Sequence, residues 1–129
     1  MADPGGQAVP ARVLVVDDEA SIRLLCRVNL ELDGHDVLEA DTLADARATL
    51  AAEDVDVVLL DVHLHGERSD ALVAECRARR PPIPVVVVTG SADVTEERLT
   101  EADAILPKPF ELDALLTTVR NLIRVHAPR

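Results

Sequence analysis

Continuous apolar runs, each followed by a polar residue, constrain the fold of this chain more than any other feature. The three clearest runs are residues 12–16, 55–60 and 85–88. Central strands of a parallel sheet carry such runs because helices cover both faces of the sheet. Residues 36–40 form a shorter, more polar run that is typical of an edge strand, and residues 104–106 complete a set of five.

Helical patterns alternate with these runs. In residues 20–32, apolar side chains at Ile22, Leu25, Cys26 and Leu32 predict one buried helix face, which Gly34 closes as a left-handed cap. Four further helices are predicted: one after a Thr42 cap, one that starts at Ser69 or Asp70, one over residues 93–100 and one over residues 111–126. Residues 62–68 read as a polar loop.

Five strand and helix units in alternation predict an α/β fold. We expect a flavodoxin-like, doubly wound parallel sheet of five strands in the order 2-1-3-4-5, with helices on both faces. Residues 1–10 read as a flexible leader and residues 11–126 as one domain. Aromatic residues make up only 1% of the chain, so the core must consist of Val, Leu, Ile and Ala.

Charge and cysteine content exclude several classes of protein. The net charge of −11 argues against a nucleic-acid or anionic-membrane surface, because binding phosphate groups requires clustered Lys and Arg. Cys26 and Cys76 belong to no Cys-x-x-Cys pattern and are expected in the core. The sequence contains no membrane-spanning run and no secretion signal, so we expect a cytoplasmic protein.

Lys108 is the only lysine of the chain and stands between two prolines. Polar groups follow four of the predicted strands, and parallel strands bring their carboxyl ends to one edge of a sheet. These groups are Asp17, Asp18, Asp61, Thr89 and Lys108. Crowded carboxylates repel each other unless a cation binds or one pKa rises, and Mg²⁺ favours carboxylates, water and phosphate oxygens. The sequence therefore predicts a magnesium and phosphoryl site.

With these motifs the sequence resembles the response-regulator receiver domain of two-component signalling, over residues 11–126. The resemblance rests on four segments: Val15-Val16-Asp17-Asp18-Glu19, Leu59-Leu60-Asp61, Val87-Val88-Thr89-Gly90 and Pro107-Lys108-Pro109-Phe110. It implies that Asp61 accepts the phosphoryl group. It also implies that Asp18 binds magnesium directly, Asp17 through water and His63 through its backbone carbonyl. Thr89 matches the switch hydroxyl, and Lys108 the phosphate-pairing lysine, with a cis bond to the following proline.

The chain departs from the family pattern at several positions. His65 occupies the place of a proline, and Ile105 that of an aromatic switch residue. The 19-residue step from Thr89 to Lys108 is shorter than usual. His63 and Ser91 hold the two variable positions beside the phosphate.

The histidines and Glu19 allow simpler readings. His63 and His65 suggest either a metal clip or, more simply, exposed loop side chains. His35 and His126 are expected on the surface, and Glu19 in the first turn of a helix, where an acid favours the helix dipole.

The resemblance implies a phosphoacceptor that assists its own phosphorylation and dephosphorylation, and not a classical enzyme. A sensor histidine kinase or a histidine phosphotransfer protein would donate the phosphoryl group, and a downstream protein target would receive the signal. We expect a stand-alone regulator similar to the chemotaxis regulator, without a nucleic-acid or membrane partner. The alternative is a receiver-fold interaction module that works without phosphorylation, as the Ile105 substitution and the short spacing suggest.

Overall fold

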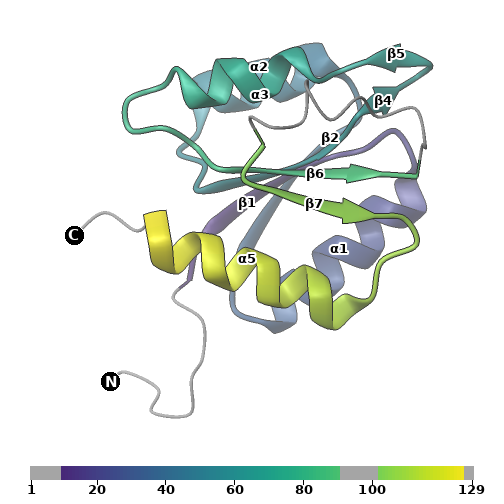
Figure 1. Ribbon diagram of the computed structural model, residues 1–129, viewed down its shortest axis with the longest axis vertical. Helices are drawn as coiled ribbons and strands as arrows, with labels where there is room; N and C mark the ends of the chain where they lie inside the picture. The colour runs from purple at the N-terminus through teal and green to yellow at the C-terminus, as the bar shows by residue number, and fades with distance from the viewer. Residues whose placement is uncertain (1–9, 91–101, 127–129) are drawn as a thin grey trace.

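The apolar runs form the predicted parallel sheet in a computed structural model that describes residues 10–90 and 102–126. The strands are β1 (Arg12–Val16), β2 (Asp36–Ala40), β3 (Val57–Asp61), β6 (Val85–Thr89) and β7 (Ala104–Pro107). Their order is β2-β1-β3-β6-β7, with every pair parallel (Figure 1). The predicted order 2-1-3-4-5 and the edge position of residues 36–40 are confirmed.

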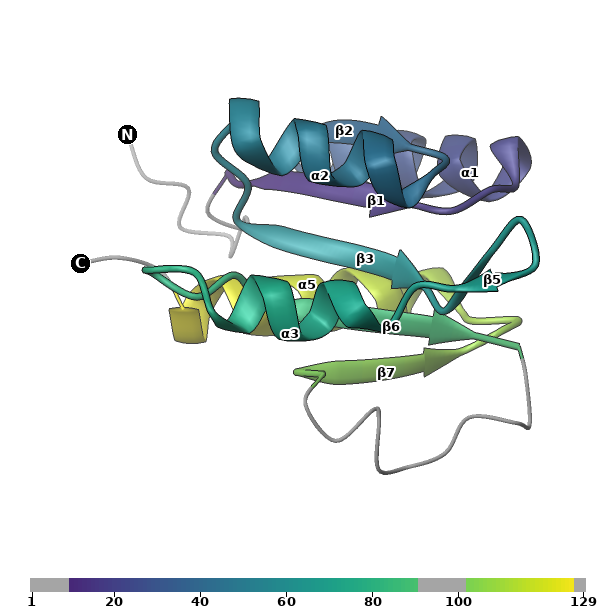
Figure 2. The same ribbon diagram turned by 90° about the horizontal axis from the view of Figure 1, so that it is seen from above.

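Helices cover both faces of this sheet, as Figure 2 shows: α2 and α3 lie on one face, and α1 and α5 on the other. The bounds are α1 (Ala20–Leu32), α2 (Leu43–Ala52), α3 (Ala71–Arg77) and α5 (Leu112–His126). Leu14 and Val16 of β1 belong to the core under α2 and α3, and Val13 and Val15 to the core under α1 and α5. This alternation buries the strand on both faces, which explains its continuous apolar run.

Several local predictions are confirmed. Thr42 caps α2 by accepting a hydrogen bond from the Asp45 backbone N–H at 3.0 Å. Gly34 follows α1 with a φ of +95°, a left-handed conformation that suits glycine. Both cysteines are buried and reduced. The helix expected at residues 93–100 and most of the expected leader lie outside the described residues.

The buried face of α1 differs from the prediction. Cys26 and Leu30 are its buried residues, whereas Leu25 is 40% exposed and Leu32 is 82% exposed. The helix therefore faces the sheet with Ile22, Cys26 and Leu30, which lie four residues apart. Among the described residues, no helix is long and apolar enough to cross a membrane.

Residues 62–68 are not an irregular loop, contrary to the prediction. They contain a two-stranded antiparallel hairpin, β4 (His63–Leu64) and β5 (Glu67–Arg68). The connecting residues His65 and Gly66 both have positive φ angles, 51° and 80°. Two positive φ angles match the right-handed twist of a hairpin with a two-residue turn. We call residues 63–68 the acceptor hairpin because they follow Asp61, for which the resemblance implies the role of phosphoryl acceptor.

His35 is also not on the surface, contrary to the prediction. It is only 3% exposed, and its Nδ1 accepts a hydrogen bond from the Ala11 backbone N–H at 3.2 Å. Its Nε2 lies 3.4 Å from Asp33 Oδ2. The side chain thus joins the start of β1 to the turn after α1. The side chain of His126 lies outside the described residues.

Candidate functional site

Four neighbouring strands bring the predicted polar residues to one edge of the sheet, on the side where the strand arrows of Figure 1 end. Asp17 and Asp18 follow β1, Asp61 is the last residue of β3, and Thr89 is the last residue of β6. Lys108 follows β7. Parallel pairing produces this arrangement, because strands in register end side by side.

Lys108 connects the strand ends through its ammonium group. Its Nζ lies 3.0 Å from Asp17 Oδ2, 3.3 Å from Asp61 Oδ2 and 3.4 Å from Glu19 Oε1. Its backbone N–H donates to the carbonyl of Thr89 at 2.8 Å, and its bond to Pro109 is cis, as predicted. A flexible point charge can contact three carboxylates from two chain segments, the loop after β1 and the end of β3.

The charges of this cluster perturb the pKa values of its members. Burial raises the pKa of Asp61, and the negative charge of Asp17 adds to the rise, whereas the His63 backbone N–H and Lys108 oppose it. Burial alone would lower the pKa of Lys108, but hydrogen bonds and charge from Asp17 and Asp61 raise it. The ammonium therefore stays charged, and the Asp61 carboxylate is less stable in its ionised form than an exposed one.

The acids after β1 form a compact oxygen-rich group. One carboxylate oxygen each from Asp17, Asp18 and Glu19 lie within 4.8 Å of one another. Glu19 precedes α1 as its cap residue, so the expectation of an acid inside the first turn is wrong, and its side chain reaches Lys108. Carboxylate oxygens are the hard ligands that a divalent cation such as Mg²⁺ prefers, so these residues fit such an ion.

Backbone N–H groups fix the orientation of three carboxylates. Asp17 Oδ1 accepts from the Glu19 N–H at 2.9 Å, and Asp61 Oδ1 from the His63 N–H at 3.1 Å. Asp18 Oδ2 accepts from the His65 N–H at 2.7 Å. Each of these contacts stabilises an ionised carboxylate in one orientation.

The histidines of the acceptor hairpin do not form a metal clip with each other. His65 Nε2 lies 3.0 Å from the backbone carbonyl of Asp41, and the acidic group described above contains no histidine. The predicted role of the His63 carbonyl as a magnesium ligand stays a prediction. Ile105 lies on β7 with 48% of its surface exposed, and Ser91 lies outside the described residues.

Sequence reasoning missed Ser69, which it considered only as a helix start. Asp70 precedes α3 instead, and Ser69 is buried with 1% exposure. Its hydroxyl contacts the carbonyl of Asp61 and lies 2.9 Å from that of Val62, while its N–H donates to Val62 at 2.7 Å. Ser69 therefore closes the chain segment that begins at Asp61. Sequence carried no signal for this role, because both the burial of Ser69 and the hairpin before it appear only in the folded structure.

Comparison with known proteins supports the resemblance. The sequence profile of the response regulator receiver domain matches residues 13–120. The chain is 33% identical over 124 residues to the response regulator MprA of Mycolicibacterium vanbaalenii, covering 93% of this chain and 53% of that protein. It is 38% identical over 126 residues to the transcriptional regulatory protein TcrA of Mycobacterium tuberculosis, covering 92% and 48%. The chain spans about half the length of these curated relatives.

Solved receiver structures have the same fold. A CheY-like receiver domain protein of Methanospirillum hungatei matches with a TM-score of 0.82 and 25% identity, over 92% of this chain and 97% of that one. The response regulator TrrA of Thermotoga maritima, solved in complex with Mg²⁺ and BeF, matches with a TM-score of 0.79 and 26% identity, over 87% and 98%. With the profile covering most of its length, this chain belongs to the response regulator receiver domain family.

Proposed function

We propose that Asp61 accepts a phosphoryl group in a magnesium-dependent reaction, with Thr89 and Lys108 stabilising the product. The observation that carries the proposal is the ammonium of Lys108, which lies between Asp17 and Asp61 at the carboxyl edge of the sheet. A fixed cation beside an acidic acceptor provides charge where phosphoryl oxygens would lie.

The chemistry needs a nucleophile, an oriented acceptor and compensation of charge. An oxygen of the ionised Asp61 attacks phosphorus, an O–P bond forms, and the P–N bond of a phosphohistidine donor breaks as the imidazole leaves with the electron pair. The His63 N–H holds the other carboxylate oxygen of Asp61 in place. Thr89 ends the neighbouring strand and is buried beside Lys108, so its hydroxyl is suited to bind a phosphoryl oxygen.

Asp17, Asp18 and the backbone carbonyl of His63 would hold magnesium together with Asp61. The ion supplies positive charge to the phosphoryl oxygens when it is bound. Both oxygens of Asp17 already accept hydrogen bonds, which supports an indirect role for this residue through water. Glu19 adds a further carboxylate at this edge.

A labelling experiment tests the proposal. In the presence of magnesium and acetyl phosphate or phosphoramidate, the wild-type protein should acquire one phosphoryl group that alkali or hydroxylamine removes, as expected of an acyl phosphate, and D61N should acquire none. Asp36, an exposed acid at the start of β2, provides the matched control, because D36N changes the net charge equally and should label normally. Labelling of D61N to the wild-type extent would contradict the proposal.

The proposed donor is a sensor histidine kinase or a histidine phosphotransfer protein, and the proposed receiver of the signal is a downstream protein in the cytoplasm. Such a domain is a signalling module that assists its own phosphorylation and dephosphorylation. Action as a stand-alone domain without a nucleic-acid partner stays a prediction, since one relative is named as a transcriptional regulatory protein and is about twice as long.

The phosphorylation-independent alternative rests on Ile105, which has no aromatic ring to move inward and is exposed on β7. Magnesium with beryllium fluoride distinguishes the two proposals, because a working receiver should show amide shift changes at Thr89 and along β7. An unchanged spectrum there would favour the alternative.

A further inference from the structure

The shortest backbone contact to a site carboxylate comes from the acceptor hairpin, 47 residues away in sequence. The N–H of His65 donates to Asp18 Oδ2 at 2.7 Å. From the described residues, Asp18 Oδ1 receives no hydrogen bond, and the residue is half-buried beside Asp17 and Glu19. The contact thus restricts rotation of the carboxylate while leaving one oxygen for another ligand.

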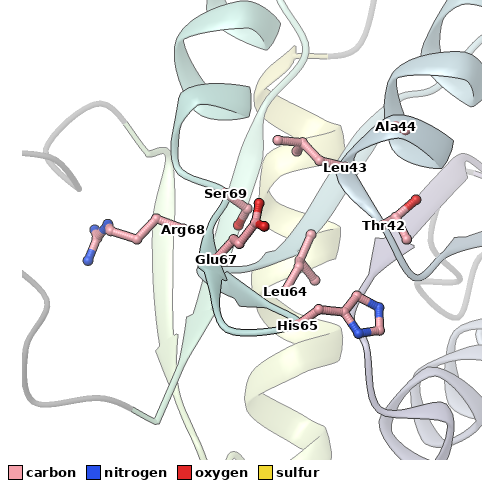
Figure 3. A pocket seen from close by; sticks show the side chains of 8 residues that line it. All are labelled: Thr42, Leu43, Ala44, Leu64, His65, Glu67, Arg68 and Ser69. Carbon is pink, nitrogen blue, oxygen red and sulfur yellow. The ribbon is translucent and has the colours of Figure 1, made fainter.

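The hairpin holds this N–H in place through the His65 side chain. Its Nε2 lies 3.0 Å from the carbonyl of Asp41, and since a carbonyl only accepts, Nε2 is the donor. Figure 3 shows the imidazole extending from the hairpin toward Thr42 at the start of α2. Leu64 and Leu43 line a pocket of about 270 Å³ between the same two segments. The imidazole contact therefore links the hairpin to the segment just before α2, beside a pocket that side chains leave open.

The contact to Asp18 also requires the unusual backbone conformation of His65. Its φ of 51° lies in the left-handed region, where residues other than glycine are uncommon. A proline at this position could not make the contact, because proline lacks a backbone N–H and fixes φ near about −65°. The contact to Asp18 thus depends on a residue that has a backbone N–H and can adopt a positive φ.

We propose that His65 is a positioning residue for the magnesium site, which rests on the proposed function. Its backbone N–H orients the Asp18 carboxylate with Oδ1 toward the ion, and its imidazole keeps that N–H in place by binding the Asp41 carbonyl. Groups that orient metal ligands in this way change metal affinity when they are lost, by about 10- to 100-fold. His65 acts through Asp18 and is not itself a magnesium ligand.

Two substitutions isolate the imidazole. H65G keeps the N–H and favours the positive φ but removes the ring, so the dissociation constant for Mg²⁺ should rise by about tenfold. H65Q places a side-chain donor at similar reach and should restore most of the affinity. E67A changes an exposed hairpin residue outside this chain of contacts and should bind Mg²⁺ as the wild type does. Titration of MgCl₂ into ¹⁵N-labelled protein at one fixed pH measures all four dissociation constants.

A measurement on the wild type tests the backbone contact directly. The His65 amide should be protected from hydrogen exchange, should remain protected when Mg²⁺ binds, and should lose protection in D18A. Loss of protection on Mg²⁺ binding would show that the N–H competes with the ion, which would overturn the positioning role. Mg²⁺ affinities of H65G within twofold of the wild type, or equal losses in H65G and H65Q, would overturn the role of the imidazole.

These results are separable from those for the proposed function. If wild-type protein shows no Mg²⁺-dependent shifts at Asp17 and Asp18, the magnesium site itself fails. If the wild type binds Mg²⁺ and Asp61 is labelled while H65G binds equally well, only the inference about His65 fails.

Discussion

At the scale of single residues, His35 is a buried titratable group far from the carboxyl edge of the sheet. Because the Ala11 N–H donates to Nδ1, the ring hydrogen of the neutral form lies on Nε2, which faces Asp33. A second proton would have to enter at Nδ1, against the N–H of Ala11. Burial lowers the pKa of His35, although the negative charges of Asp33 and Asp56 oppose the change and Arg120 adds to it.

This lowered pKa predicts loss of stability in acid. Between the folded pKa and the unfolded value of about 6.5, the unfolded chain binds more protons than the folded one, so the free energy of unfolding falls as pH falls. H35N keeps an acceptor for the Ala11 N–H but does not titrate, so its stability should fall less from about pH 8 to about pH 5. Urea unfolding across this range measures the difference.

Subtracting the two pH profiles removes the contributions of the other histidines and of Asp61, since both proteins contain them. The free energy of unfolding of the wild type should fall more steeply with falling pH than that of H35N, and only below about pH 6.5. Parallel curves would show that the folded protein does not resist protonation at this position.

At the scale of elements, Ser69 closes the acceptor hairpin onto the end of β3. S69A removes the hydroxyl from the carbonyls of Asp61 and Val62, which are buried. We expect a loss of about 1–2 kcal/mol in the free energy of unfolding and faster hydrogen exchange in β4 and β5. S21A, at an exposed position of α1, is the control and should change stability by less than about 0.5 kcal/mol. Equal stability of S69A and wild type would contradict this role.

The elements also show where sequence patterns stop being informative. Continuous apolar runs predicted the strands, because burial on both faces leaves such runs, and the alternation of strands and helices predicted the strand order. These patterns could not find the acceptor hairpin, because each of its strands has only two residues and His65 is not a typical residue for a positive φ. The buried face of α1 was misjudged because apolar residues occur all around that helix, including exposed Leu24 and Leu32.

The site was predicted better than its supporting contacts. Asp17, Asp61, Thr89 and Lys108 meet because parallel strands end together, which strand order alone implies. The hydrogen bonds from Ser69 and the hairpin amides depend on the turn conformation, and the burial of His35 depends on tertiary packing. Neither leaves a periodic pattern in the sequence.

At the scale of the whole molecule, the protein is acidic, and several of its carboxylates gather at the carboxyl edge of the sheet. Binding of Mg²⁺ to the folded state alone should therefore stabilise the protein, by about 2.7 kcal/mol at a concentration 100-fold above the dissociation constant. A thermal unfolding series with increasing MgCl₂ measures this gain. The double variant D17A/D18A should show little response, and an equal gain in both proteins would assign the effect to ionic strength.

The sharing of one ammonium among three carboxylates has a consequence for the order of assembly. With Asp18 included, four carboxylates and one ammonium leave three negative charges uncompensated, and a divalent cation would leave one. A phosphoryl group would then enter a site whose repulsion has already fallen. Cation and phosphoryl group should thus bind with positive coupling, and by reciprocity the phosphorylated protein should retain its cation more tightly than the unmodified one.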